Sequence, residues 1–161
     1  MRKILFLLTF IVLTVFVNGQ YAGFTAASQG GAAAAVNVIS NGTFDSADDW
    51  TVSQITISGG VATTVDNGIR SLTQAQADMI SGMENSTAYT FKITVSAVSY
   101  VYIQTASTNV DYVSGFSELA IGVNTLQFTS PANTVADGGG LALVFLGTNI
   151  FTIDDIILTK D

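Results

Sequence analysis

The chain has 161 residues, of which 48% are hydrophobic, and it carries 12 acidic against 5 basic side chains with no cysteine and no histidine. This length suits one domain with its own core plus a short processed segment. The two missing residue types exclude disulfide bonds, Ser-His-Asp and Cys-His nucleophile systems, and the usual zinc sites.

The first 19 residues have the pattern of a secretory signal peptide. Met1-Arg2-Lys3 is a basic start, and residues 4–17 form an apolar run too short to span a membrane comfortably. Val17 and Gly19 supply the small residues wanted at −3 and −1, so we expect cleavage after Gly19. A retained N-terminal anchor is the alternative. Residues 20–35 are rich in glycine and alanine, which indicates a flexible spacer or a short alanine helix.

Export would leave a strongly acidic chain. Without the signal the basic residues are Arg70, Lys92 and Lys160, and against 12 acids they give a net charge of −9. Three scattered cations form no basic patch, so nucleic acid and anionic membrane are disfavoured as partners.

Two acid-bearing segments stand at opposite ends of the expected domain, residues 36–161. A first strand is expected at 36–40, followed by a turn and an acidic loop that runs through Asp45 to Trp50. Residues 151–160 are expected to form the last strand and include Asp154 and Asp155. We expect the first and last strands to lie side by side.

Alternation of apolar and polar residues predicts short strands between these ends. Gly59-Gly60 separates two alternating runs and predicts a β-hairpin with a primed turn, because both turn positions tolerate φ > 0. Residues 89–97 alternate strictly and predict a strand with one buried face. Further strands are expected at 70–74, 100–104, 123–129 and 141–146, the last of them central because it is apolar on both faces.

These signals predict an all-β fold. About eight short strands without a convincing long amphipathic helix indicate an antiparallel β-sandwich. A jelly-roll type is favoured over an immunoglobulin-like arrangement, because the two acidic ends are expected to meet.

Three stretches resemble carbohydrate-binding modules of the family 4/9/22 type, which are galactose-binding-domain-like β-sandwiches. Residues 37–45 (NVISNGTFD) followed by Trp50 resemble the opening motif, 151–158 (FTIDDIIL) the closing strand, and 89–93 (YTFKI) a strand between them. The resemblance covers residues 36–161 and implies a glycan-binding module without catalysis. Similar modules occur in phage virion proteins and surface adhesion proteins.

The resemblance also implies a structural calcium ion. Asp45 and Asp154 match the family positions whose carboxylates bind it, and Ca²⁺ takes six to eight hard oxygen ligands. The alternative is a turn-capping Asp45 and a solvent-facing Asp154. Ile153 and Ile156 are three residues apart, so either a bulge lies at Asp154-Asp155 or the strand is buried on both sides.

The aromatic residues offer a candidate ligand site. Tyr100 and Tyr102 alternate with the expected core residues of their strand and should project from the opposite face, with Gln104 extending the strip. Tyr112 and Phe116 in the following loop are expected to border it. The alternative is an outer face covered by that loop.

Trp50 is the only tryptophan. An exposed indole can stack on a sugar ring, but in this motif we expect Trp50 to pack into the core.

The sequence thus predicts a secreted or cell-surface module that binds a neutral polysaccharide or attaches to a surface. Catalysis is not expected, because the paired acids Asp48/Asp49 and Asp154/Asp155 are sequence neighbours, and neighbours on a strand point to opposite faces. The alternative is a virion or cell-surface assembly subunit with the same fold and no sugar site. Only 11% of residues are charged, so part of the exterior can be buried in a homo-oligomer.

Overall fold

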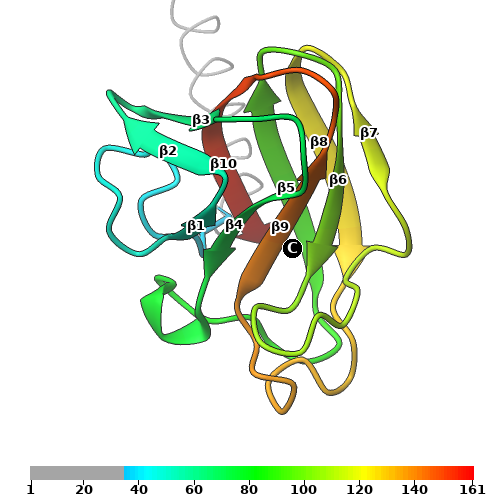
Figure 1. Ribbon diagram of the computed structural model, residues 1–161. Coiled ribbons are helices and arrows are strands. Elements are labelled where there is room, and N and C mark those ends of the chain that lie inside the picture. The colour runs from blue at the N-terminus through cyan, green and yellow to red at the C-terminus, as the bar shows by residue number, and fades with distance from the viewer. Residues whose placement is uncertain (1–34) are drawn as a thin grey trace, which may run out of the picture. The chain divides into compact units, whose positions relative to one another are not determined.

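The computed structural model describes residues 35–161, which form one compact unit, Ala35–Asp161. The predicted signal peptide and the spacer up to residue 34 lie outside the described residues. Ten strands make up the unit (Figure 1). Their bounds are β1 Thr51–Ser53, β2 Ile55–Ser58, β3 Val61–Thr64, β4 Arg70–Gln74, β5 Ala88–Val95, β6 Ser99–Gln104, β7 Ser117–Leu119, β8 Gly122–Thr129, β9 Leu141–Leu146 and β10 Thr152–Lys160, with one 3-10 turn at Gln76–Asp78.

The strands form two five-stranded antiparallel sheets packed face to face. One has the order β1-β4-β9-β6-β7 and is called here the front sheet, since it faces the viewer in Figure 1; the other, the back sheet, has the order β2-β3-β10-β5-β8. The predicted antiparallel β-sandwich is confirmed, with ten strands rather than about eight. As predicted, β9 is central in its sheet, and β10 is central in the other.

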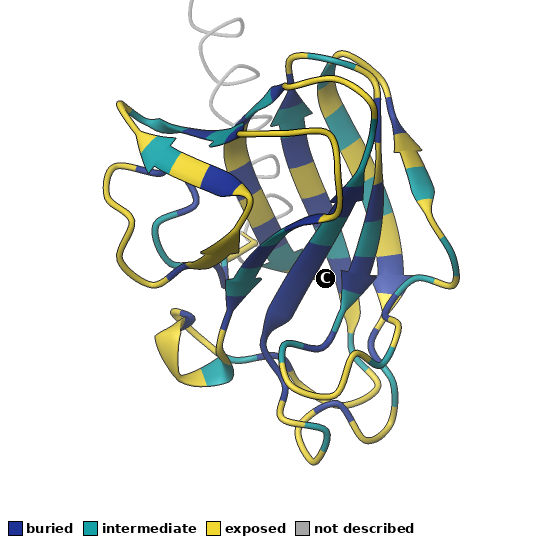
Figure 2. Ribbon diagram, viewed as in Figure 1, coloured by how far each residue is buried: buried dark blue, intermediate teal, exposed yellow. Residues whose placement is uncertain are grey.

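The predicted hairpin and alternating strand are both present. Ser58 and Val61 are paired across a turn in which Gly59 and Gly60 have φ of 62° and 82°. Residues other than glycine rarely adopt this conformation, because their Cβ makes it unfavourable. In β5 every second residue from Tyr89 onward is buried. This alternation appears in Figure 2 as bands along the back sheet.

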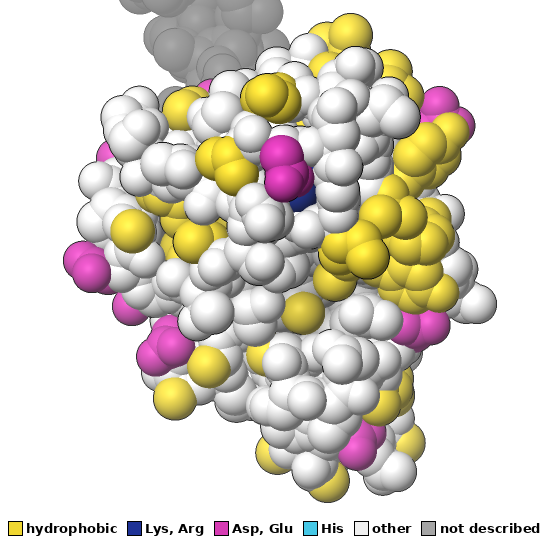
Figure 3. Space-filling view, viewed as in Figure 1, with side chains coloured by type: hydrophobic (Ala, Val, Ile, Leu, Met, Phe, Trp, Pro, Cys, Tyr) yellow, Lys and Arg dark blue, Asp and Glu magenta, His cyan; other side chains and the backbone are white. Residues whose placement is uncertain are grey.

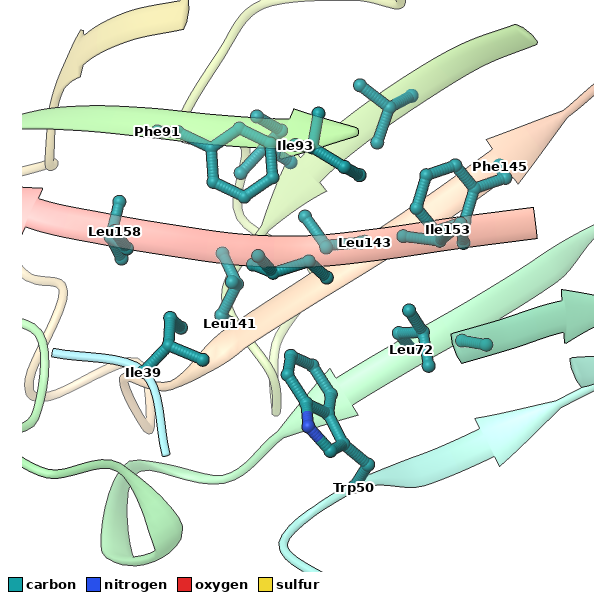
Figure 4. Close-up of a cluster of buried hydrophobic side chains, with 14 of the residues drawn as sticks. Ile39, Trp50, Leu72, Phe91, Ile93, Leu141, Leu143, Phe145, Ile153 and Leu158 are labelled. Carbon is teal, nitrogen blue, oxygen red and sulfur yellow. The ribbon is translucent and has the colours of Figure 1, made fainter. Parts of the chain in front are cut away.

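The core lies between the sheets and takes side chains from both (Figure 4). Leu72 and Leu143 from the front sheet face Phe91 and Ile153 from the back sheet, and all four are fully buried. At about 1.5–3 kcal/mol for each buried aliphatic or aromatic side chain, this layer supplies the main free energy of folding. In the described part of the chain, no helix is long and apolar enough to cross a membrane.

The two ends of the domain lie side by side, as predicted, but the first segment is not a strand. It makes one bridge, Asn37 with Thr159, and the Val38 N–H donates to the Leu158 carbonyl at 2.7 Å. The Asn37 side-chain carbonyl then accepts the Leu158 N–H at 3.0 Å in place of a backbone carbonyl, and the Val38 carbonyl accepts from Ile80. The ladder therefore stops after one pair.

The last strand contains a bulge, which is one of the two alternatives that its sequence left open. Its register against β5 shifts between Asp154 and Ile156, and Asp155 has φ of 46°. The extra residue lets both Ile153 and Ile156 point into the core. At the bulge the Ile156 N–H donates to the Gly42 carbonyl at 2.9 Å, and a Cβ on Gly42 would collide with the Ile156 carbonyl oxygen. Only glycine allows this close contact between the two ends.

Candidate functional site

The outer face of the front sheet carries the predicted tyrosines. On β6 the inward residues Val101 and Ile103 are fully buried, while Tyr100 is 43% exposed. Tyr102 and Gln104 share its face and are half-buried. The placement predicted from the two-residue period is therefore confirmed.

Phe116 completes an aromatic strip with Tyr100 and Tyr102. It is 47% exposed, and its ring meets the Tyr102 ring edge to face with centroids 4.2 Å apart. Leu146 and Val144 of β9 lie opposite Tyr100 and Tyr102 in the ladder and are half-buried on the same face. Figure 3 shows hydrophobic side chains gathered over the part of the face where β6 and β7 lie.

The other half of this face carries the hydroxyl groups of serine and threonine side chains. Ser71 lies opposite Val144 and Thr73 opposite Ala142 in the β4–β9 ladder. The pairing continues to β1, where Ser53 and Thr51 lie opposite these two residues. An apolar aromatic strip thus passes into a row of small hydroxyl groups across one sheet face. This combination can contact the C–H faces and the hydroxyls of a polar ligand.

Two acids border the strip. Asp111 forms a bridge to Gln104, whose Nε2 donates to the Asp111 carboxylate at 2.9 Å. Glu118 lies opposite Tyr100 on β7 and is exposed. These carboxylates disfavour an acidic ligand at the strip.

Tyr112 does not border the strip, which corrects the expectation from the sequence. It is 6% exposed, and its ring stacks on Phe128 with centroids 5.4 Å apart. Its hydroxyl donates to the Gly140 carbonyl at 2.8 Å. Burial raises the pKa of the Tyr112 phenol well above its ordinary value. Tyr112 is a core residue that anchors the loop before β9.

Trp50 packs inward, as predicted. It is 7% exposed, its ring lies 5.6 Å from that of Phe44, and its Nε1 donates to the Asn41 carbonyl at 3.0 Å. Figure 4 shows the indole pointing into the core near Leu72. It therefore belongs to the core and presents no stacking face to solvent.

The acidic loop is held by Asn41. The Asn41 Nδ2 donates to the carbonyls of Ser46 and Asp48, and its Oδ1 accepts the Asp45 N–H at 3.0 Å. The Asp49 carboxylate accepts from the Ser40 hydroxyl at 2.6 Å. These contacts shape the loop between the first segment and β1.

Asp45 and Asp154 are both exposed. The Asp45 carboxylate accepts from the Thr43 hydroxyl at 2.8 Å. Among residues 35–161, no group of three or more acidic, histidine or cysteine side chains is placed to hold a metal. Carboxylate oxygens suit Ca²⁺, but Asp45 and Asp154 alone supply fewer than the six to eight oxygen ligands that it takes. Carbonyl, hydroxyl and water oxygens would have to complete the coordination.

The cations among residues 35–161 lie away from the strip. Arg70 is fully buried, where its Nε donates to the Asp66 carbonyl and its Nη1 to the Gly147 carbonyl, with the guanidinium 5.8 Å from the Phe151 ring centroid. Lys160 pairs with Glu84 at 2.7 Å. Lys92 is exposed on β5 in the back sheet. The described part of the front face thus offers no exposed basic side chain.

Sequence reasoning missed several residues of this face. Val144 and Leu146 belong to a strand that is apolar on both sides, so periodicity alone did not say which residues face outward. Glu118 lies on the three-residue strand β7, too short to leave a pattern. Asp111 follows a loop, where sequence periodicity does not indicate the direction of a side chain, and its contact with Gln104 is what places it on this face.

No protein-family model matches the sequence, and no curated protein matches it. Solved structures do. A family 4 carbohydrate-binding module matches with TM-score 0.50 and 17% identity over 73% of this chain and 98% of its own. A tailspike protein of bacteriophage CBA120 matches with TM-score 0.52 and 16% identity over 78% of this chain.

A Clostridium thermocellum xylanase fragment with a family 22 module, solved with xylohexaose, matches with TM-score 0.50 and 10% identity over 79% of this chain. The chain spans 22% of the tailspike structure and 28% of the xylanase structure. At these identities the likeness is one of fold. This fold, a β-sandwich also found in the family 4 module, is the one that the sequence resemblance implied.

Proposed function

We propose that this protein is an exported, non-catalytic module that binds a neutral polysaccharide on the outer face of its front sheet. The observation that carries the proposal is the exposed aromatic strip of Tyr100, Tyr102 and Phe116. An otherwise well-packed sandwich holds these rings at its surface, beside a row of hydroxyl groups.

Aromatic rings and hydroxyls suit a sugar. A pyranose presents an apolar C–H face that packs on a ring, and its hydroxyls bond to side chains such as Gln104, Ser71 and Thr73. The carboxylates of Asp111 and Glu118 at the strip favour a ligand without negative charge. The fold shared with a family 4 carbohydrate-binding module supports the same role.

A calcium ion at Asp45 and Asp154 belongs to the proposal as a structural element. The contact of Ile156 with Gly42 joins the segments that carry these acids, and both side chains are exposed and available as ligands. The ion would fasten the two ends of a domain that has no disulfide. It would take no part in ligand binding at the strip.

A glycan array probed with the exported protein tests the function. We expect binding to neutral β-linked or α-linked polysaccharides and none to uronic-acid polymers. Binding restricted to acidic glycans would contradict the proposal, as would an array without any bound glycan.

The second candidate is an assembly subunit without a sugar site. The likeness to a phage tailspike supports it, since that structure carries the same fold within a larger chain. A protein that binds no glycan but forms a defined assembly would favour this candidate.

A further inference from the structure

The four sheet edges of this sandwich differ greatly in length. β1 and β7 have three residues each and β2 has four, whereas β8 has eight. Short edge strands are one way in which proteins avoid pairing with other chains, because few backbone groups are left open. β8 is the long edge, and among residues 35–161 it pairs only with β5.

The outer backbone groups of β8 have no partner in the part of the chain that the structure describes. The Ser130 N–H donates to the Thr87 carbonyl, which places Ser130, and with it every second residue of β8, in the hydrogen-bonded position towards β5. The residues between them direct their N–H and C=O groups away from β5, and within residues 35–161 no other segment pairs with these groups. They are Val123, Thr125, Gln127 and Thr129, and all four are exposed.

β8 also lacks the usual protection of an edge. Its sequence, GVNTLQFT, contains no charged residue and no proline. Its register against β5 runs without a shift from Gly122 to Thr129, so no bulge twists the edge away. A long, regular, uncharged edge strand is a template for another strand.

The charge distribution identifies the strand that fits. On the outer face, β5 and β8 carry no acid, and Lys92 is their one charge. The nearest acids are Asp161, whose carboxylate accepts from the Thr90 hydroxyl on β5, and Asp154 on β10, the next strand. Two copies of the exported chain, each with net charge −9, repel each other over most of their surface, and this strip is where they can approach closely.

We propose that β8 pairs antiparallel with β8 of a second copy across a two-fold axis. The two back sheets then form one continuous ten-stranded sheet, in which the free groups of Thr125 and its neighbours bond to their equivalents. Such a contact is isologous, so assembly stops at the dimer. This dimer does not depend on the proposed glycan binding.

Light scattering on the exported protein tests the dimer. We expect twice the mass of one chain for the native protein and a single-chain mass for Thr125→Lys, because two ammonium groups would face each other near the axis. Thr56→Lys is the matched control, since it places the same charge on β2, the short edge of the same sheet, and it should leave the dimer intact. Circular dichroism verifies that both variants fold.

Cysteine crosslinking locates the contact, and the chain has no cysteine of its own to interfere. Among the single substitutions Val123→Cys, Thr125→Cys and Gln127→Cys, the one nearest the axis should give a disulfide-linked dimer on oxidation, because a disulfide needs Cα atoms within about 7 Å. Thr56→Cys should give none. A monomeric native protein, larger polymers, or crosslinking at β2 as strong as at β8 would each overturn the proposal.

Discussion

Aromatic side chains have two roles in this protein: Tyr100 and Tyr102 lie at the surface for contact with a ligand, and Trp50 packs in the core. The two tyrosines hold their rings at the surface of β6, while the indole is buried beside Phe44. A ring that already packs in the core contributes its area to folding. A ring held at the surface leaves its apolar area open to contact with a ligand.

We therefore expect Tyr100→Ala and Tyr102→Ala each to weaken polysaccharide binding about tenfold or more, since central aromatic contacts dominate binding free energy. The melting temperature should change little for Tyr100→Ala, and modestly for Tyr102→Ala, which also loses its contact with Phe116. Isothermal titration calorimetry and thermal melts measure the two effects.

Trp50→Ala is the contrasting variant. It should lower the free energy of unfolding by about 3–5 kcal/mol through the cavity that it leaves. Sugar affinity of the folded fraction should be retained. The assignment fails if the tyrosine variants unfold while the tryptophan variant stays folded and loses the sugar.

Tyr112 gives a prediction about stability and pH. Tyr112→Phe removes the bond to the Gly140 carbonyl and should cost about 1–3 kcal/mol, with sugar affinity unchanged. Because the folded pKa lies above the unfolded value near 10, the folded state keeps a proton that the unfolded state loses. Stability should therefore fall as the pH rises above about 10, and less steeply in Tyr112→Phe. Urea unfolding from pH 8 to 11 measures this slope, and equal slopes would contradict the assignment.

At the residue scale, periodicity predicted what lies on regular strands. It placed Tyr100 and Tyr102 correctly because Val101 and Ile103 fix the buried face. It failed for Tyr112, since a loop has no period and the partners of this side chain, Phe128 and Gly140, are distant in the sequence. Local pattern cannot reveal such contacts.

At the element scale, the two ends of the domain meet at the β10 bulge. The spacing of Ile153 and Ile156 was enough to limit this strand to two alternatives, a bulge or burial on both faces, and the structure has the bulge. The strands β1 and β7 were not predicted, since three residues carry too little alternation. The first segment was predicted as a strand, but the Asn37 side chain replaces the backbone after one pair.

The calcium proposal makes a prediction for these ends. A ligand that binds only the folded state stabilises it by mass action, so a chelator should lower the melting temperature of the native protein. Asp154→Ala should remove this sensitivity, while Asp66→Ala, which alters an acid on a different loop, should keep it. Identical melting curves with and without chelator would rule out the ion.

At the scale of the whole molecule, export is the first requirement of the proposed role. We expect the exported form to begin near Gln20, because the basic start, the apolar run and the small residues at the cleavage site occur in the order that signal peptidase needs. Intact-mass spectrometry of the exported protein measures its N-terminus. An intact Met1 would show that the segment is kept.

The proposed dimer has a consequence for binding that also rests on the proposed glycan site. A two-fold axis between antiparallel β8 strands is perpendicular to the shared back sheet, so both front sheets lie on the same side of it. Both aromatic strips would then face one surface. A long polysaccharide could occupy both strips at once, whereas a short oligosaccharide could occupy only one.

We therefore expect the native protein to bind a long polysaccharide about a hundredfold more tightly than a short oligosaccharide of the same sugar, because the second contact is intramolecular. Thr125→Lys should lose this advantage and keep the oligosaccharide affinity, since β8 lies in the sheet opposite the strip. Thr56→Lys should behave like the native protein. Surface plasmon resonance with both ligands distinguishes the two proposals. If all three proteins bind the long polysaccharide with equal affinity, bivalent binding is contradicted and the sugar site is not. If Thr125→Lys loses its affinity for the oligosaccharide, the sugar site has been misplaced.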